Sequence, residues 1–100
     1  MVIATVYHWK VEKGKEQAFE QAWSQATKDI YKKRGSLGSS LHKHKDGTYY
    51  AYARWPSKMK RTTMLLLPPY KKRMPMATLL EEPIVLELKE DYLRKKPKKT

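Results

Sequence analysis

The hydrophobic positions of this chain change their period along the sequence, and each change predicts a different element. Residues 2–11 are mostly β-branched or aromatic and contain no Gly or Pro, which predicts a strand. Both faces of this strand are largely apolar, as is typical of a strand in the middle of a sheet. After Gly14 the apolar residues recur at helical spacing as far as Ile30, which predicts a helix of about five turns. Gly35 follows a basic last turn and is placed to take the left-handed helix cap.

Residues 35–55 favour a β-hairpin. Two stretches, 36–45 and 48–55, are joined by Asp46 and Gly47, and a Gly in such a turn accepts a positive φ at little steric cost. Side chains alternate across a strand, so the second stretch sends one set of residues to each face. The first set is Tyr49, Ala51, Ala53 and Trp55, and the second is Tyr50, Tyr52 and Arg54.

Shorter elements are predicted after the hairpin. Ser57 is placed as the N-cap of a short helix over 58–67, which ends before a Pro-Pro pair. The helical spacing over 70–82 is interrupted, so we expect a loop and a second short helix that begins at Pro75. Residues 84–92 alternate between apolar and polar, which predicts a strand with one solvated face.

The element order β, α, β, β, α, β predicts a ferredoxin-like α+β domain, with its helices on one face of a four-stranded antiparallel sheet. We assign residues 1–93 to this domain and 94–100 to a basic C-terminal tail. The helix-free face has no segment left to cover it, so we expect a homodimer that pairs these faces. Its apolar and aromatic residues are Val2, Ala4, Val6, Tyr50 and Tyr52. We place Glu87 and Lys89 on the same face, where they make part of it polar.

Composition narrows the functional classes. The chain has 22 Lys and Arg against 10 Asp and Glu, and the net charge of +12 favours encounters with anions of any kind. The absence of Cys excludes disulfides and thiol nucleophiles and fits a reducing compartment, so we expect a cytoplasmic location. No basic start precedes the short N-terminal apolar stretch, and the longest apolar run ends at Pro68, so we expect neither a secretory signal nor a membrane span.

Four stretches carry a resemblance to a known family. They are YHWKVEKGKEQAFEQAW, RGSLGSSLHK, DGTYYAYARWPS and PIVLELKE, and they include a Gly that opens the first helix and a Trp that closes the third strand before a Ser-led helix. In these features and in element order the chain resembles the antibiotic biosynthesis monooxygenase superfamily of dimeric α+β barrels. The resemblance implies a homodimer and a pocket between sheet and helices in each subunit. Some members oxidise polyphenols with molecular oxygen without metal or flavin, and others degrade haem.

The haem-degrading members use an Asn on the first strand, a Trp at the end of the third and a His on the following helix. Trp55 matches the Trp, but Tyr7 stands at the Asn position and no His follows Pro56. Without an axial His the iron would lack its protein ligand. We therefore expect no haem, and no other cofactor or metal.

With haem excluded, the resemblance implies a cofactor-independent monooxygenase, or a small-molecule-binding protein. In either case the protein is expected to act on or bind an aromatic compound. Such an oxidoreductase needs an apolar cavity, help in removing the proton of a phenol, and donors that stabilise charge as it passes to oxygen. We predict Tyr7 and Trp55 as catalytic residues and Trp9 and Trp23 as substrate-binding residues. The alternative is that these are core aromatics whose polar tips find partners within the fold.

The three histidines leave two interpretations open. His42 and His44 are two positions apart on one strand and share a face, and His8 on the neighbouring strand can approach them. They can form a polar cluster on the sheet, or a three-histidine metal site.

A different functional class has the same element order. The RNA-recognition module stacks bases on aromatic residues of its third strand, and Tyr50 and Tyr52 would suit that role. Gly47 is preceded by Asp46 and followed by Thr48, however, which departs from the RNP1 pattern. Single-stranded nucleic-acid binding is thus the alternative function. For a pocket protein we expect nucleic-acid binding to be weak, nonspecific and sensitive to salt.

Overall fold

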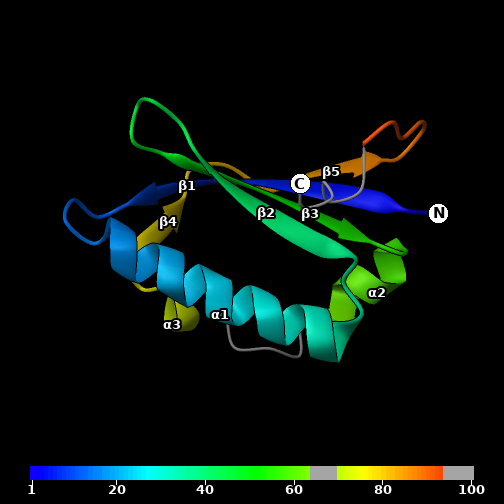
Figure 1. The fold of residues 1–100 in the computed structure, drawn as a ribbon, viewed down its shortest axis with the longest axis horizontal. Helices are drawn as coiled ribbons and strands as arrows, with labels where there is room; N and C mark the ends of the chain where they lie inside the picture. The colour runs from blue at the N-terminus through cyan, green and yellow to red at the C-terminus, as the bar shows by residue number, and fades with distance from the viewer. Residues whose placement is uncertain (64–69, 94–100) are drawn as a thin grey trace, which may run out of the picture.

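The computed structural model describes residues 1–63 and 70–93, which form one antiparallel sheet with helices on a single face (Figure 1). The strands are β1 (Ile3–Val11), β2 (Gly38–Lys43), β3 (Tyr49–Trp55), β4 (Ala77–Leu79) and β5 (Ile84–Glu87). The helices are α1 (Glu16–Arg34), α2 (Lys58–Thr62) and α3 (Tyr70–Arg73). The strand order is β2-β3-β1-β4, and β5 also pairs with β1. The predicted ferredoxin-like α+β arrangement is confirmed.

The central strand is β1, as its two apolar faces predicted. It pairs antiparallel with β3, in a register that sets Ile3 opposite Trp55 and Trp9 opposite Tyr49. On its other edge β1 pairs first with β5 and then with β4. Two short strands therefore share the position at which one long strand was predicted.

The prediction of a helix from Pro75 is wrong, because this segment supplies β4 instead. The amide of Glu12 donates to the carbonyl of Met76 (3.0 Å), and the amide of Leu80 donates to the carbonyl of His8 (2.9 Å), which extends the ladder at both ends of β4. The outer edge of β1 needs partners for its main-chain groups, and that requirement outweighs the weak helical spacing. The predicted end of the preceding helix and the predicted basic tail, 94–100, lie outside the described residues.

The register of β5 corrects the predicted faces of the last strand. Directly opposed residues of an antiparallel pair share a face, and Ile84 lies opposite Val6. Leu86 likewise lies opposite Ala4, whereas Glu87 lies opposite Ile3 on the helix side. The prediction that Glu87 makes the helix-free face polar is therefore wrong. The strand also ends earlier than predicted, because the amide of Leu88 bonds to Val2 (3.0 Å), near the start of β1, and little partner backbone remains beyond it.

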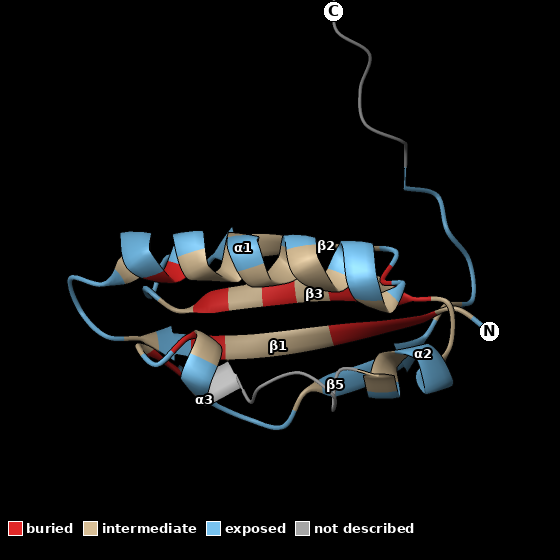
Figure 2. Cartoon of the chain, turned by 90° about the horizontal axis from the view of Figure 1, so that it is seen from below, coloured by how far each residue is buried: buried red, intermediate tan, exposed pale blue. Residues whose placement is uncertain are grey.

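The helices divide the covered face of the sheet between them. Helix α1 lies over the side formed by β2 and β3 (Figure 2), whereas α3 lies beside β4 and α2 lies beyond the end of β3 (Figure 1). Gly35 ends α1 in the left-handed conformation, at φ 76°, as predicted. The turn between β2 and β3 also matches its prediction, with φ 90° at Gly47. Among the described helices, none has the length and apolar character needed to cross a membrane.

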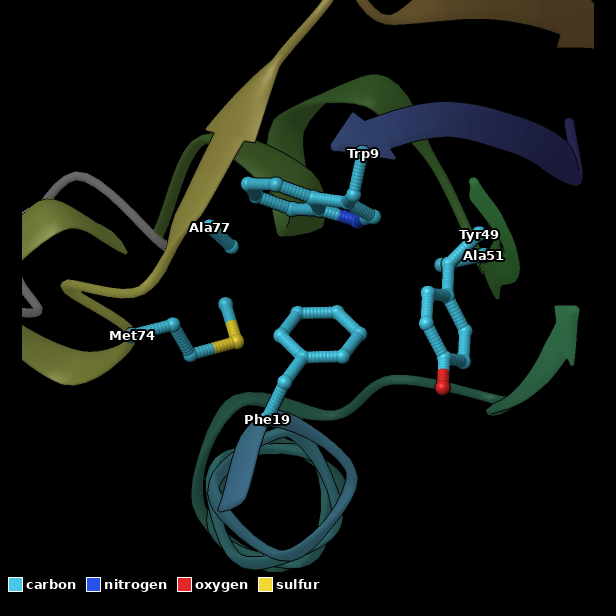
Figure 3. Packing of buried hydrophobic residues seen from close by; sticks show 6 residues of the cluster. All are labelled: Trp9, Phe19, Tyr49, Ala51, Met74 and Ala77. Atoms are coloured by element: carbon cyan, nitrogen blue, oxygen red, sulfur yellow. The ribbon is translucent and has the colours of Figure 1, made fainter. Parts of the chain in front are cut away.

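The main hydrophobic core lies between α1 and one end of the sheet. Phe19 projects from α1 toward Trp9, with Met74 and Tyr49 on either side of it (Figure 3). The ring centroid of Phe19 lies 6.2 Å from that of Trp9 and 5.0 Å from that of Tyr49, both in tilted arrangements that favour aromatic contact. Ala51 and Ala77 complete the buried cluster.

Tyr49 has a perturbed hydroxyl and gives a pH-dependent prediction. Its hydroxyl donates to Glu20 Oε2 at 2.5 Å, and burial, with this hydrogen bond second, raises the pKa of Tyr49 from 10.0 to about 12. A pKa that is higher in the folded than in the unfolded chain means that the folded state holds the proton more tightly. We therefore expect the free energy of unfolding to fall as pH rises from the unfolded to the folded pKa. Urea unfolding at several pH values across this alkaline range measures the free energy of unfolding.

The matched control for that experiment is Tyr49→Phe, which keeps the ring and removes the ionisable group. The difference between wild type and variant isolates Tyr49 from the other groups that titrate at alkaline pH. Parallel stability curves for the two proteins would contradict the prediction.

Candidate functional site

Tyr7 lies at the centre of the helix-side surface of β1. Its ring stacks against that of Trp9, with centroids 6.0 Å apart and an interplanar angle of 15°. On β3 the residue opposite Tyr7 is Ala51, and the residue opposite Thr5 is Ala53. Because β3 offers only methyl groups here, the large side chains around Tyr7 come from β1 and from the helices.

Trp55 closes β3 at the other end of this surface, opposite Ile3. It is fully buried, and its indole Nε1 has no hydrogen-bond partner among the described residues. The Oγ1 of Thr5, also fully buried on the same face of the sheet, has no partner either. A buried polar group without a partner costs about 1–3 kcal/mol. Neither of these two groups is therefore satisfied by residues 1–63 and 70–93.

Helix α2 brings an arginine to Tyr7. Ser57 caps the helix as predicted, and its Oγ accepts a hydrogen bond from the amide of Lys60 at 3.2 Å. Arg61, one turn on, donates from Nη2 to the hydroxyl of Tyr7 at 3.3 Å. The Nε of Arg61 is buried and has no partner within residues 1–63 and 70–93.

Arg73 of α3 is close enough to the same phenol for the two groups to interact electrostatically. Burial lowers the pKa of the Arg73 guanidinium from its usual value, and the charge of the neighbouring Tyr7 partly offsets that effect. The sequence reasoning missed Arg61, Arg73 and Thr5, because nothing in the pattern of the basic segments shows which side chains turn inward.

The two predicted substrate-binding tryptophans lie in or against the main core. Trp9 is buried in contact with Phe19, and Trp23 of α1 is half-buried and packs against the same cluster. Tyr7 links this cluster to Arg61, whereas Trp55 is not part of the cluster. Trp9 thus belongs to this cluster and Tyr7 and Trp23 pack against it, whereas Trp55 lies at the far end of the surface. The catalytic and binding roles of all four remain predictions.

The histidines lie away from this surface. His8 is opposite Tyr50, which is in turn opposite His42, so the three form a row on the helix-free face. The rings of His8 and Tyr50 stack at 4.1 Å, and His8 Nε2 lies 2.9 Å from Thr48 Oγ1. His8 Nδ1 lies 3.5 Å from a carboxylate oxygen of Glu81. In the part of the chain that the structure describes, no group of three His, Asp or Glu side chains is arranged to hold a metal ion.

Comparison with known proteins identifies the fold. No protein-family model matches the sequence, and no curated protein matches it significantly. Solved structures do match. SnoaB, a cofactor-independent oxygenase from Streptomyces nogalater, has a TM-score of 0.76 and 15% identity over 93% of this chain and 98% of its own. Rv0793 from Mycobacterium tuberculosis has a TM-score of 0.73 and 13% identity over 93% of this chain and 100% of its own.

A third match is a Bordetella bronchiseptica protein proposed to be an antibiotic biosynthesis monooxygenase, with a TM-score of 0.68 and 22% identity over 89% of this chain and 97% of its own. The sheet order and the one-sided helices define the class as ferredoxin-like α+β. Within that class, the chain has the fold of the antibiotic biosynthesis monooxygenase superfamily, and the resemblance noted from the sequence is confirmed at the level of the fold. At these identities the likeness carries no residue roles.

The alternative of nucleic-acid binding finds no support in these comparisons, since none of the three proteins is described as binding nucleic acid. The two tyrosines it depends on already have contacts within the chain. Tyr50 stacks on His8, and the ring of Tyr52 lies 5.6 Å from the guanidinium of Arg54.

Proposed function

We propose that this chain binds a small aromatic compound on the helix side of its sheet and oxygenates it with molecular oxygen, without a metal or an organic cofactor. The observation that carries the proposal is the pair of buried polar groups without partners, Trp55 Nε1 and Thr5 Oγ1, on the face that also holds Tyr7. The likeness in fold to SnoaB, a cofactor-independent oxygenase, supports the reaction type.

The residues suit the chemical demands of this reaction. A bound phenol must lose its proton before its ring gives up electrons readily, and the resulting negative charge then passes to oxygen. The guanidinium of Arg61 can stabilise the phenolate, and the indole of Trp55 can donate a hydrogen bond to developing charge. In this proposal the hydroxyl of Tyr7, to which Arg61 donates a hydrogen bond at 3.3 Å, exchanges a proton with the bound hydroxyl. Trp9 supplies a flat apolar wall beside it.

Trp55→Phe tests the role of the indole N–H. It keeps an aromatic ring and removes the donor, so we expect binding of α-naphthol to weaken by about tenfold, the effect of losing one hydrogen bond. Calorimetric titration measures the affinity, and an oxygen electrode with a dihydroxyanthrone measures turnover, which we expect to fall as well.

Tyr49→Phe is the matched control, because it also removes one buried polar group from the helix-side face of β3 but does so within the main core. We expect it to bind α-naphthol as the wild type does. If both variants lost the same affinity for α-naphthol, the effect would be general destabilisation of the fold. No binding of α-naphthol by the wild type would count against the proposed function itself.

We further propose that the helix-free face forms a homodimer. Ile84 and Leu86 are 47% and 48% exposed on that face, next to Val6 and Ala4 on β1. With the half-buried Val6 and Tyr52 they form an apolar band on this face, bordered by the Arg54–Asp91 ion pair, and an exposed apolar patch is typical of an interface. A second copy of the chain offers the same apolar face. Two such bands would cover one another across a two-fold axis.

A further inference from the structure

We propose that the homodimer interface extends over the histidine row of the helix-free face, so that the dimer dissociates when these histidines become charged. The histidine row consists of His8, Tyr50 and His42, which lie opposite one another on β1, β3 and β2. This inference rests on the proposed homodimer and adds its regulation by pH. It depends on the size of the apolar band, the place of the histidines in the fold, and the charges around them.

The apolar band alone is small for an interface. Its side chains are those of Val6, Tyr52, Ile84 and Leu86. A stable interface buries about 800 Å² on each partner, from about 20–30 residues. On one side the band is bordered by Arg54 and Asp91, whose charged atoms are 2.6 Å apart and neutralise one another. The next row of side chains on the other side is the histidine row, since Tyr50 lies two positions from Tyr52 on β3.

All three histidines of the chain lie on this face. His8 and His42 share it with Tyr50 through the strand register, and the ring of His44 lies 6.1 Å from that of Tyr50. Histidine is the side chain whose charge ordinarily changes between about pH 5 and 8. The side-chain charge that the chain gains on acidification through this range is therefore gathered on one surface.

The neutral histidine row is suited to a contact between two chains. The rings of His8 and Tyr50 stack with centroids 4.1 Å apart and an interplanar angle of 6°. His8 Nε2 lies 2.9 Å from Thr48 Oγ1, and His42 Nε2 lies 2.9 Å from Ser40 Oγ. Both histidines thus have a polar partner within their own chain and need none from the second copy.

Protonation would leave one of the three histidine charges without an opposing charge. His8 Nδ1 lies 3.5 Å from Glu81 Oε1, and His44 Nδ1 lies 3.2 Å from Asp46 Oδ1, so a carboxylate lies beside each of these rings. His42, by contrast, takes part in no ion pair within residues 1–63 and 70–93. The largest effect of acidification on the interface is therefore expected at His42.

The groups that face His42 do not offset its charge. Tyr50 lies opposite it on β3, and His44 follows it by two positions along the chain. Across the same face, Lys10 follows His8 by two positions on β1. The second copy brings the same cations and a net charge of +12. Like charges set against one another across an interface disfavour binding, so charging His42 in both copies should weaken the dimer.

Sedimentation velocity over a concentration series at two pH values tests this inference. We expect the dissociation constant of the dimer to be about tenfold higher or more at about pH 5.5 than at about pH 8. His42→Gln stays neutral, so its dissociation constant should change by less than about threefold over the same range. His42→Lys carries its charge throughout and should weaken the dimer by about tenfold already at the higher pH.

His44→Gln is the matched control for net charge. It removes the same ionisable group two positions along the chain, where Asp46 opposes the charge. It should keep the pH dependence of the wild type. Circular dichroism confirms that each protein is folded at both pH values, and His42→Lys at the higher pH serves as the test if the wild type unfolds at the lower one.

The outcomes separate this inference from the proposed homodimer. If the wild type is a folded dimer of equal affinity at both pH values, this inference is wrong and the homodimer stands. If the wild type is a monomer at both, the homodimer fails and this inference fails with it. If His44→Gln loses as much pH dependence as His42→Gln, the effect comes from overall positive charge, which also overturns the inference.

Discussion

Phe19→Ala should lower the free energy of unfolding by about 3–5 kcal/mol, because it removes a whole aromatic side chain from a packed core. Phe19 is 0% exposed and is in ring contact with both Trp9 and Tyr49, so the cavity left behind would lie between the helix and the sheet. Domains of this size have about 5–15 kcal/mol of stability in total. The variant should therefore be close to unfolding at body temperature. Urea denaturation followed by circular dichroism measures the change.

Met59→Ala is the comparison for this experiment. Met59 is a large apolar residue of α2, but it is 80% exposed and contributes little to the core. We expect it to change stability by less than about 0.5 kcal/mol. If Phe19→Ala had an equally small effect, α1 would not be held to the sheet by the packing described above.

Leu86→Glu should convert the proposed homodimer into a folded monomer. It would place an unpaired carboxylate in the apolar band of the helix-free face, and burying such a charge costs enough to weaken the dimer by about a hundredfold or more. Sedimentation velocity at micromolar concentration should give a dimer for the wild type and a monomer for the variant. A wild type that stays monomeric under these conditions would remove the basis for the proposed interface.

Val85→Glu provides a closely matched control. Val85 is the preceding residue of β5 and is 42% exposed, against 48% for Leu86, but it lies opposite Thr5 and so belongs to the helix side. The two variants carry the same new charge on neighbouring positions of one strand and differ only in the face that receives it. We expect Val85→Glu to remain dimeric. Dissociation of both variants would mean that β5 itself had been displaced.

The parts of the fold that could be predicted are those set by short-range chemistry. Gly35 ends α1, the Asp46-Gly47 pair forms the hairpin turn, and Ser57 caps α2, because each depends on the conformation of a few neighbouring residues. β4 could not be predicted in this way. It has three residues, and its conformation is set by the open edge of β1, which lies more than 60 positions away in the sequence.

The candidate site could also be predicted only in part. The alternation of side chains along β1 and β3 was sufficient to put Tyr7 and Trp55 on the helix side. The same rule could not select Arg61 from the basic residues of α2, since the direction of its side chain depends on how that short helix meets the sheet. The face of Glu87 was also beyond prediction, because a shift of one position in the pairing of β5 with β1 exchanges the two faces.

The central position of β1 also has a consequence for how the chain folds. This strand is made first, yet one of its edges is closed by β3 and the other by β4 and β5, which are made last. Ile3 lies opposite Glu87, so the contacts that enclose the strand are among the most distant in the sequence. Pairing of this kind must close a long loop before it gains any stability, and folding is slow as a result. During synthesis one edge of β1 therefore stays open until β4 and β5 have been made, and an open strand edge favours aggregation.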